Sequence, residues 1–125
     1  MQKRSINKAI IIGRVGQNPE ISYSKSKLAI ARYSIATNET KTNPDGNKAE
    51  HTEWHNIVSL GQQAEFIREY VKKGQLIYLE GRLKTRKWED KNNINHYKTE
   101  IITDSITPLE WLSDNNDKSE KKLPI

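Results

Sequence analysis

The chain has no cysteine and few apolar residues. The absence of cysteine excludes disulfides, thiol catalysis and cysteine-ligated metal sites. Hydrophobic residues make up 34% of the 125 residues, so one compact domain would have a small core. The longest apolar run, Ala9–Ile12, is too short to cross a membrane or to form a secretory signal. We therefore expect a small cytoplasmic domain with no membrane partner.

Basic residues outnumber acidic ones, and the excess is unevenly placed. Lys and Arg total 21 against 16 Asp and Glu, which gives a net charge of +5. The charges within residues 113–125 cancel, so the whole excess lies in residues 1–112. We expect one domain over 1–112 and a short disordered tail over 113–125, because the tail is polar throughout. A basic domain is compatible with a nucleic-acid partner, although charge alone does not identify one.

Alternating apolar and polar residues predict five strands. They are expected at residues 6–15, 28–37, 53–60, 75–83 and 95–104. In the fourth strand the alternation groups Ile77, Leu79 and Leu83 on one face. Two polar stretches lie between strands: 38–52, expected to be a loop with a Pro-Asp-Gly turn, and 84–94, expected to be a charged hairpin.

Residues 61–73 predict a single helix. Ala64, Ile67 and Val71 fall on one helical face, and Gly74 follows as a left-handed C-terminal cap. Three strands, one helix and two further strands is the order of the oligonucleotide-binding (OB) fold. The expected architecture is therefore all-β: a five-stranded Greek-key barrel with its helix between the third and fourth strands.

A tryptophan lies within a cluster of cations in the charged hairpin. Trp88 is flanked in RLKTRKWEDK by Arg82, Lys84, Arg86 and Lys87. An exposed indole can stack on a base while nearby cations hold phosphates. The alternative is that Trp88 folds back over its own hairpin, and the residues leave both possibilities open.

Other candidate contacts lie in the first and third strands. Trp54 and Leu60 share a face of the third strand, which is expected to point into the core; if it faces outward instead, they form an apolar floor for bases. Four basic residues precede the first acidic residue of the chain: Lys3, Arg4, Lys8 and Arg14. They either contact DNA or form a solvated basic N-terminal segment.

His51, Glu53 and His55 alternate and would share one face of a strand. Three such side chains are potential metal ligands. A polar His55 at a packing interface explains the same residues more simply, and we favour it. The sequence contains no G-x-S-x-G motif, P-loop or carboxylate pair, so we expect neither an enzyme nor a cofactor.

Several long stretches resemble the bacterial-type single-stranded DNA-binding protein family. They are INKAIIIGRVGQNPEI (6–21), TEWHNIVSLG (52–61), EYVKKGQLIYLEGRLKTRKWED (69–90) and YKTEI (97–101). The resemblance spans residues 5–108. It implies an OB barrel and a homotetramer that binds single-stranded DNA without strong sequence preference, associated with the nucleoid, and protects it during replication, recombination and repair.

The resemblance also implies particular contacts. Trp54 and Trp88 match two aromatic residues on which the family stacks bases, whereas Lys41 and Leu60 stand at two other aromatic positions. His55 matches a histidine at a subunit contact.

The tail differs from the family's acidic tip, which recruits replication and repair proteins. This chain ends in SEKKLPI, whose lysines would oppose a basic pocket on such a partner. The altered tail, Lys41 and Leu60 motivate an alternative function: an OB-fold accessory protein that docks replication or recombination proteins and binds DNA weakly. Trp111, at the end of the barrel, is expected to pack.

Overall fold

The computed structural model describes residues 4–111, so Lys3 and the predicted tail at 113–125 lie outside the described residues. Within that range six strands and one helix follow one another, and no helix there is long and apolar enough to span a bilayer. The elements are β1 (Ala9–Val15), β2 (Glu20–Tyr23), β3 (Ala29–Thr42), β4 (Lys48–Leu60), α1 (Gln62–Tyr70), β5 (Leu76–Glu89) and β6 (Asn95–Pro108).

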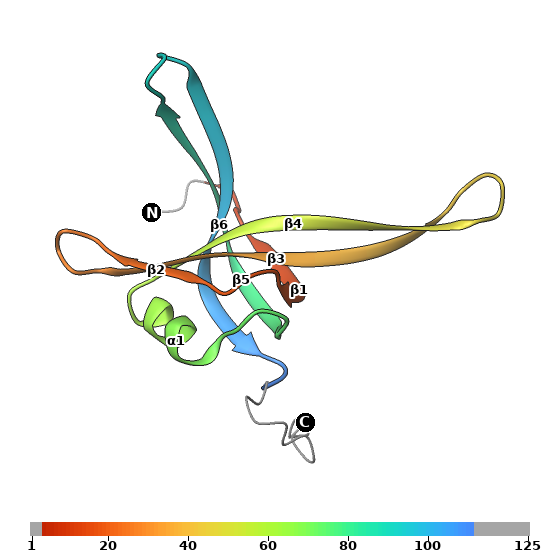
Figure 1. Cartoon of the computed structure of the whole chain (residues 1–125), viewed down its shortest axis with the longest axis horizontal. Helices are drawn as coiled ribbons and strands as arrows, with labels where there is room; N and C mark the ends of the chain where they lie inside the picture. The colour runs from red at the N-terminus through yellow and green to blue at the C-terminus, as the bar shows by residue number, and fades with distance from the viewer. Residues whose placement is uncertain (1–3, 112–125) are drawn as a thin grey trace.

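Five of the strands close into a barrel (Figure 1). Around the ring, β1 pairs with β5, β5 with β6, β6 with β4, β4 with β3, and β3 again with β1. Only the β4–β6 pairing is parallel. The helix lies between β4 and β5, the third and fourth strands of the ring, so the predicted OB fold is confirmed. The short strand β2 was not predicted; it pairs with β3 outside the ring.

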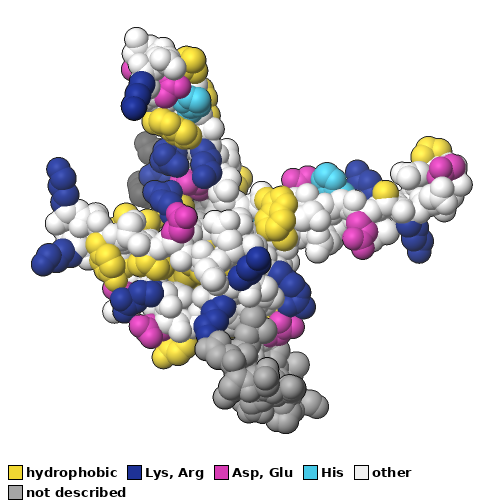
Figure 2. Space-filling view, in the orientation of Figure 1, with side chains coloured by type: hydrophobic (Ala, Val, Ile, Leu, Met, Phe, Trp, Pro, Cys, Tyr) yellow, Lys and Arg dark blue, Asp and Glu magenta, His cyan; other side chains and the backbone are white. Residues whose placement is uncertain are grey.

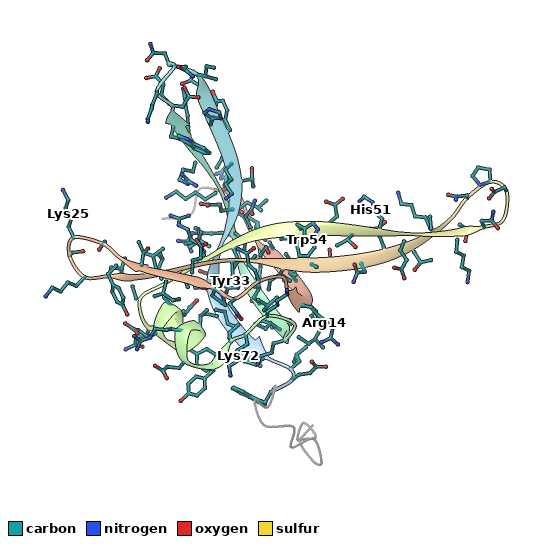
Figure 3. The ribbon with its side chains drawn as sticks, in the orientation of Figure 1. Arg14, Lys25, Tyr33, His51, Trp54 and Lys72 are labelled. Atoms are coloured by element: carbon teal, nitrogen blue, oxygen red, sulfur yellow. The ribbon has the colours of Figure 1, made fainter. Side chains whose placement is uncertain are left out.

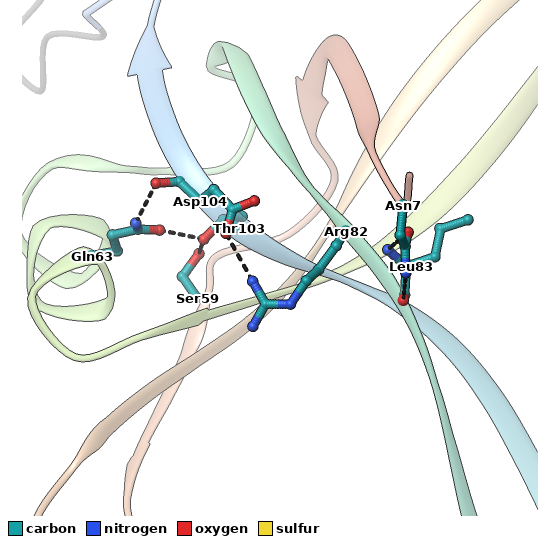
Figure 4. Close-up of polar contacts among 7 residues, drawn as sticks. All are labelled: Asn7, Ser59, Gln63, Arg82, Leu83, Thr103 and Asp104. Atoms are coloured by element: carbon teal, nitrogen blue, oxygen red, sulfur yellow. Dashed lines mark hydrogen bonds and ion pairs between the residues drawn. The ribbon is translucent and has the colours of Figure 1, made fainter. Parts of the chain in front are cut away.

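The core lies inside the barrel, under the helix. Ala64, Ile67 and Val71 are buried there, as the helical periodicity predicts. A polar network closes this end, with the Tyr33 hydroxyl 2.8 Å from Ser59 Oγ. Thr103 bonds Ser59 and Gln63 in the same network (Figure 4). Burial raises the pKa of the Tyr33 hydroxyl well above its ordinary value, so it stays protonated within the network.

The helix is shorter than predicted and ends at Tyr70. Val71 has extended backbone angles and packs into the core. Gly74 is left-handed, with φ of 91°, but it belongs to the turn after the helix, where its N–H donates to the Val15 carbonyl. The prediction of Gly74 as the helix cap was therefore wrong, because burial of Val71 and the bonds to β1 end the helix earlier.

Two long hairpins, which we call the β3–β4 arm and the β5–β6 arm, leave the barrel in different directions (Figure 1). The predicted loop at 38–52 was wrong: β3 runs to Thr42, β4 starts at Lys48, and only 43–47 is loop. Both faces of a ribbon that projects into water are polar, so its sequence lacks the alternation that predicts a strand. The hairpin predicted at 84–94 is confirmed, with its turn at 90–94.

The root of the β5–β6 arm is fastened to the barrel (Figure 4). The Asn7 side chain bonds both the N–H and the carbonyl of Leu83, each at 2.8 Å, and Arg82 pairs with Asp104 at 2.8 Å. Alternation groups Leu83 with the buried Ile77 and Leu79, but Leu83 is 48% exposed, because it lies beyond Gly81, where the pairing of β5 with β1 ends.

Candidate nucleic-acid interface

A groove of about 420 Å³ lies where the two arms leave the barrel. The root of the β3–β4 arm supplies Trp54 and Asn56, and β6 supplies Lys98 and Glu100. The rest of the lining comes from β3, including Arg32, from Ile57 of β4, from Glu20 at the start of β2 and from the segment after β1. We call this hollow the arm groove. It combines an aromatic wall with cations, the two kinds of group that hold an unpaired nucleic-acid strand.

Trp54 faces outward, into the arm groove. Side chains alternate along β3 and β4, and the face that carries Tyr33, Ile35 and Ile57 fills the barrel. Trp54, on the opposite face, is 59% exposed. The expectation of a core residue was thus wrong. Leu60 shares its face by alternation and is 39% exposed, but it does not line the groove.

Trp88 lies on the β5–β6 arm, partly covered by its own hairpin. Its ring stacks on His96, with centroids 5.3 Å apart and planes 19° from parallel, and Arg86 Cζ lies 4.6 Å from the ring centroid. His96 also bonds Asp90 at 2.7 Å, and this bond lowers the pKa of the Asp90 carboxyl. Trp88 is still 39% exposed, so the structure combines both alternatives: an indole packed within its hairpin that keeps an open surface.

The two faces of the β5–β6 arm carry different cations. Alternation puts Lys84 and Arg86 on the face of Trp88. Lys87 lies on the other face, 5.7 Å from the ring centroid of Tyr97, which is 64% exposed. Lys87 therefore does not join the cluster around Trp88, although it is adjacent in sequence. Tyr97 was not among the residues predicted from the sequence; the hairpin register that places it opposite Lys87 was the available signal.

One buried carboxylate joins the barrel wall to the β5–β6 arm. Glu100 is 5% exposed, and its Oε2 accepts a hydrogen bond from Arg32 at 2.9 Å and another from Arg86 at 3.4 Å. Neither Arg32 nor Glu100 was among the site residues predicted from the sequence. No local signal pairs them, because they are 68 residues apart in the chain.

Two of the other cations predicted at the site are engaged in ion pairs beside β1. Lys8 pairs with Glu80 at 3.2 Å. Arg14 pairs with Glu110 at 2.8 Å and also donates to the Gly74 carbonyl, below the arms (Figure 3). These pairs hold β1 to its neighbours. Arg4 is exposed ahead of β1, with φ of 59°, and the Lys84 side chain has no hydrogen-bond or ion-pair partner among residues 4–111.

Lys41 lies far along the β3–β4 arm, away from Trp54. It pairs in register with Ala49, and alternation places it on the face of His51 and Glu53, the opposite side from Trp54. The hydrogen bond from His51 is the main cause of a lowered pKa at the Glu53 carboxyl, and the charges of the two histidines and Lys41 lower it further.

The three candidate metal ligands do not converge. His51 bonds Glu53 at 2.7 Å, whereas His55 bonds Thr37 at 2.9 Å and is half-buried. In the part of the chain that the structure describes, no three His, Asp or Glu side chains gather as metal ligands.

Positive and apolar surfaces meet at the arm groove in the view of Figure 2. Lys and Arg side chains gather over the lower part of the β5–β6 arm. A hydrophobic patch lies at the root of the β3–β4 arm, where Figure 3 labels Trp54. The groove between the arms is therefore bordered by both.

Comparison with known proteins agrees with this geometry. The family model described as the single-strand binding protein family matches residues 6–109. The chain belongs to the single-strand binding protein family. This places it among binding proteins rather than enzymes.

Solved structures of single-strand binding proteins are similar to the chain over most of its length. A Plasmodium falciparum protein of this kind, solved in complex with single-stranded DNA, is 34% identical with a TM-score of 0.80, over 88% of this chain and 100% of that one. A deletion mutant of the single-stranded DNA binding protein from Thermus aquaticus is 32% identical with a TM-score of 0.73, over 84% of this chain and 51% of that one.

Proposed function

We propose that the chain binds single-stranded DNA in the arm groove, with Trp54 and Trp88 as stacking surfaces. The observation that supports this most is Trp54, a tryptophan more than half exposed in a groove that also contains Arg32 and Lys98. As a single-strand binding protein, the chain protects DNA strands that are unpaired during replication, recombination and repair.

Two physical effects drive the binding. Arginine and lysine neutralise phosphates and release condensed counterions, which makes the affinity fall as salt rises. Bases then stack on the indoles, each stack contributing about 1–3 kcal/mol with little dependence on sequence. Duplex DNA hides its base faces within the helix, so this mode favours single strands.

Titration with oligo(dT) and with a duplex of equal length tests this function. We expect tight binding of oligo(dT) at modest salt, with quenched tryptophan fluorescence, and much weaker binding of the duplex. Absence of quenching, together with retention of a replication or recombination protein in a pull-down, would support the accessory function instead. Lys41 and Leu60, where the family stacks bases, are the residues that favour that alternative.

We also propose that the chain assembles into a homotetramer. Ile10 and Ile12 are 58% and 53% exposed on the outer face of β1. Within residues 4–111, β1 pairs with β5 from Ala9 to Arg14 but with β3 only at Arg14 and Val15. The second edge of β1 is therefore open, and a second copy that pairs there would cover the apolar face. We place His55 at another subunit contact.

The mass of the assembly with and without oligo(dT) tests the oligomeric state. We expect four chains per complex in both cases. Ile12→Lys is expected to lower the mass, because it puts a charge into the buried contact. A monomer at every concentration would contradict the tetramer and leave DNA binding to be judged by the titration above.

The cellular setting is proposed on chemical grounds. Unpaired DNA occurs in the nucleoid of the cytoplasm, so a fluorescent fusion is expected to follow the DNA stain, and a distribution independent of DNA would contradict this.

Deletion of 119–125 tests recruitment of replication or repair proteins through SEKKLPI. If the tail recruits such a partner, the deletion abolishes capture of the partner without changing oligo(dT) affinity.

A further inference from the structure

An acidic side chain lies in the groove to which we assign DNA. Glu100 is 5% exposed and lines the arm groove beside Trp54. A negative charge there repels phosphate, so electrostatics alone predicts that it weakens binding. The side chain needs another reason to occupy this position.

The contacts of Glu100 supply that reason. Its Oε2 accepts from Arg32 of β3 at 2.9 Å and from Arg86 of β5 at 3.4 Å. The two arginines are thus held by one oxygen, although they come from different strands. Each side chain remains more than two-fifths exposed, so a phosphate can reach part of each, although Nε of Arg86 is buried.

One arginine shares the arm groove with Trp54, and the other contacts the ring of Trp88. Arg32 lines the arm groove with Trp54, and the Cζ of Arg86 lies 4.6 Å from the Trp88 ring centroid. Lys98 lines the groove, and Lys84 is opposite Glu100 in register. These four cations outnumber the two carboxylates that line the groove, Glu100 and the exposed Glu20, so the local charge remains positive.

We propose that Glu100 is a positioning residue for DNA binding: it fixes Arg32 and Arg86 as a two-arginine phosphate clamp between Trp54 and Trp88. This inference rests on the proposed function. Arginine presents its donors in a planar fork, and a side chain already held in the bound orientation loses less conformational entropy when the phosphate arrives. The carboxylate thus contributes through order, and that contribution exceeds its repulsion of phosphate.

Glu100→Gln separates the positioning of the arginines from the repulsion of phosphate, because loss of the first lowers the DNA affinity and loss of the second raises it. If Glu100 positions the arginines, its loss lowers oligo(dT) affinity about three- to tenfold. The plot of log K against log salt also becomes shallower by about 0.7 to 1.4, the change for one or two phosphate contacts with a single strand. If Glu100 acts only by its charge, affinity rises and the slope does not become shallower. That result would overturn the proposal.

Glu89→Gln is the matched control. Glu89 is exposed on the same arm, and its side chain has no hydrogen-bond or ion-pair partner among the described residues. It undergoes the same chemical change without releasing an arginine. We expect unchanged or slightly higher affinity and an unchanged slope. A loss equal to that of Glu100→Gln would overturn the proposal, because it would show that arginine positioning is not the cause.

A protein that already lacks both arginines distinguishes positioning from a general structural defect. When Glu100→Gln is added to the double variant Arg32→Gln, Arg86→Gln, we expect no further change in the salt slope. A further decrease of the same size would overturn the proposal.

If Glu100→Gln does not fold, as judged by its melting curve, the single variants Arg32→Gln and Arg86→Gln test the clamp instead. Each is expected to lower the salt slope by about 0.7, and unchanged slopes in both would overturn the clamp. Wild-type chain that fails to bind oligo(dT) would instead contradict the proposed function.

Discussion

Gly16 lies directly against the Trp54 ring. A Cβ at position 16 would come within 2.3 Å of Trp54 Cζ3 and 2.8 Å of Ser34 Oγ. No real Cβ tolerates such a contact, so any side chain larger than hydrogen displaces the ring. The missing side chain of Gly16 thus sets the position of the indole in the arm groove.

Gly16→Ala is therefore expected to weaken oligo(dT) binding by up to the value of one stack, about 1–3 kcal/mol, while the melting temperature changes little because Trp54 is outside the core. Fluorescence titration and a melting curve measure the two quantities. Gly46→Asn, at an arm tip with no atom near its Cβ position, is the control. Equal affinity of Gly16→Ala and wild type would show that the ring position does not matter.

The two tryptophans are expected to contribute unequally. Trp54 is 59% exposed, whereas Trp88 is 39% exposed and stacks on His96. Each replacement by alanine should weaken binding by about 1–3 kcal/mol, with the larger loss for Trp54→Ala. The salt slope should change little in either variant, because stacking releases no counterions. Unchanged affinity in Trp88→Ala would remove Trp88 from the site.

Three lysines test which faces of the arms the DNA follows. Lys84 shares the face of Trp88, whereas Lys87 and Lys41 lie on faces opposite Trp88 and Trp54. Lys84→Ala should lower the salt slope by about 0.7, the change for one phosphate contact. Lys87→Ala and Lys41→Ala should leave it unchanged. The reverse pattern would mean that the strand follows the outer faces, past Tyr97.

The Arg14–Glu110 pair predicts a pH dependence of stability. The bond from Arg14 lowers the pKa of the Glu110 carboxyl below its ordinary value of 4.5. A carboxyl with a lowered folded-state pKa stabilises the fold above its ordinary pKa, and this contribution disappears as pH falls through the folded-state value. Wild type should therefore melt at a higher temperature than Glu110→Gln at pH 7, and the difference should shrink below about pH 4.5. A difference independent of pH would show that the charge of Glu110 is not involved.

The sequence predicted the barrel because its strands bury one face. Ala31, Tyr33 and Ile35 alternate with the polar Arg32 and Ser34 and are all buried, so their periodicity shows both the strand and its inner side. The arms lack such a face, and the sequence predicted a loop where β3 and β4 continue. Secondary structure maintained by backbone pairing in water leaves little pattern in the side chains.

The site was predictable only in part, for a related reason. Trp54 and Trp88 are conspicuous in sequence, but their environments depend on Gly16 and His96, which no local pattern marks. Lys87 is adjacent to Trp88 in sequence and on the opposite face in space. Arg32 and Glu100 meet only because the barrel closes, so their pairing required the structure.

The most direct test of DNA binding in the arm groove is a fluorescence titration with oligo(dT) in the Trp111→Phe background. Trp111 packs edge-on against Phe66 and Tyr70, and phenylalanine keeps that aromatic contact while leaving Trp54 and Trp88 as the only fluorescent indoles. We expect strong quenching at modest salt, reversed by added salt, and loss of most of the signal change when Trp54 is also replaced by Phe. Binding of oligo(dT) with no quenching in the Trp111→Phe protein would contradict stacking on Trp54 and Trp88 and place the DNA elsewhere.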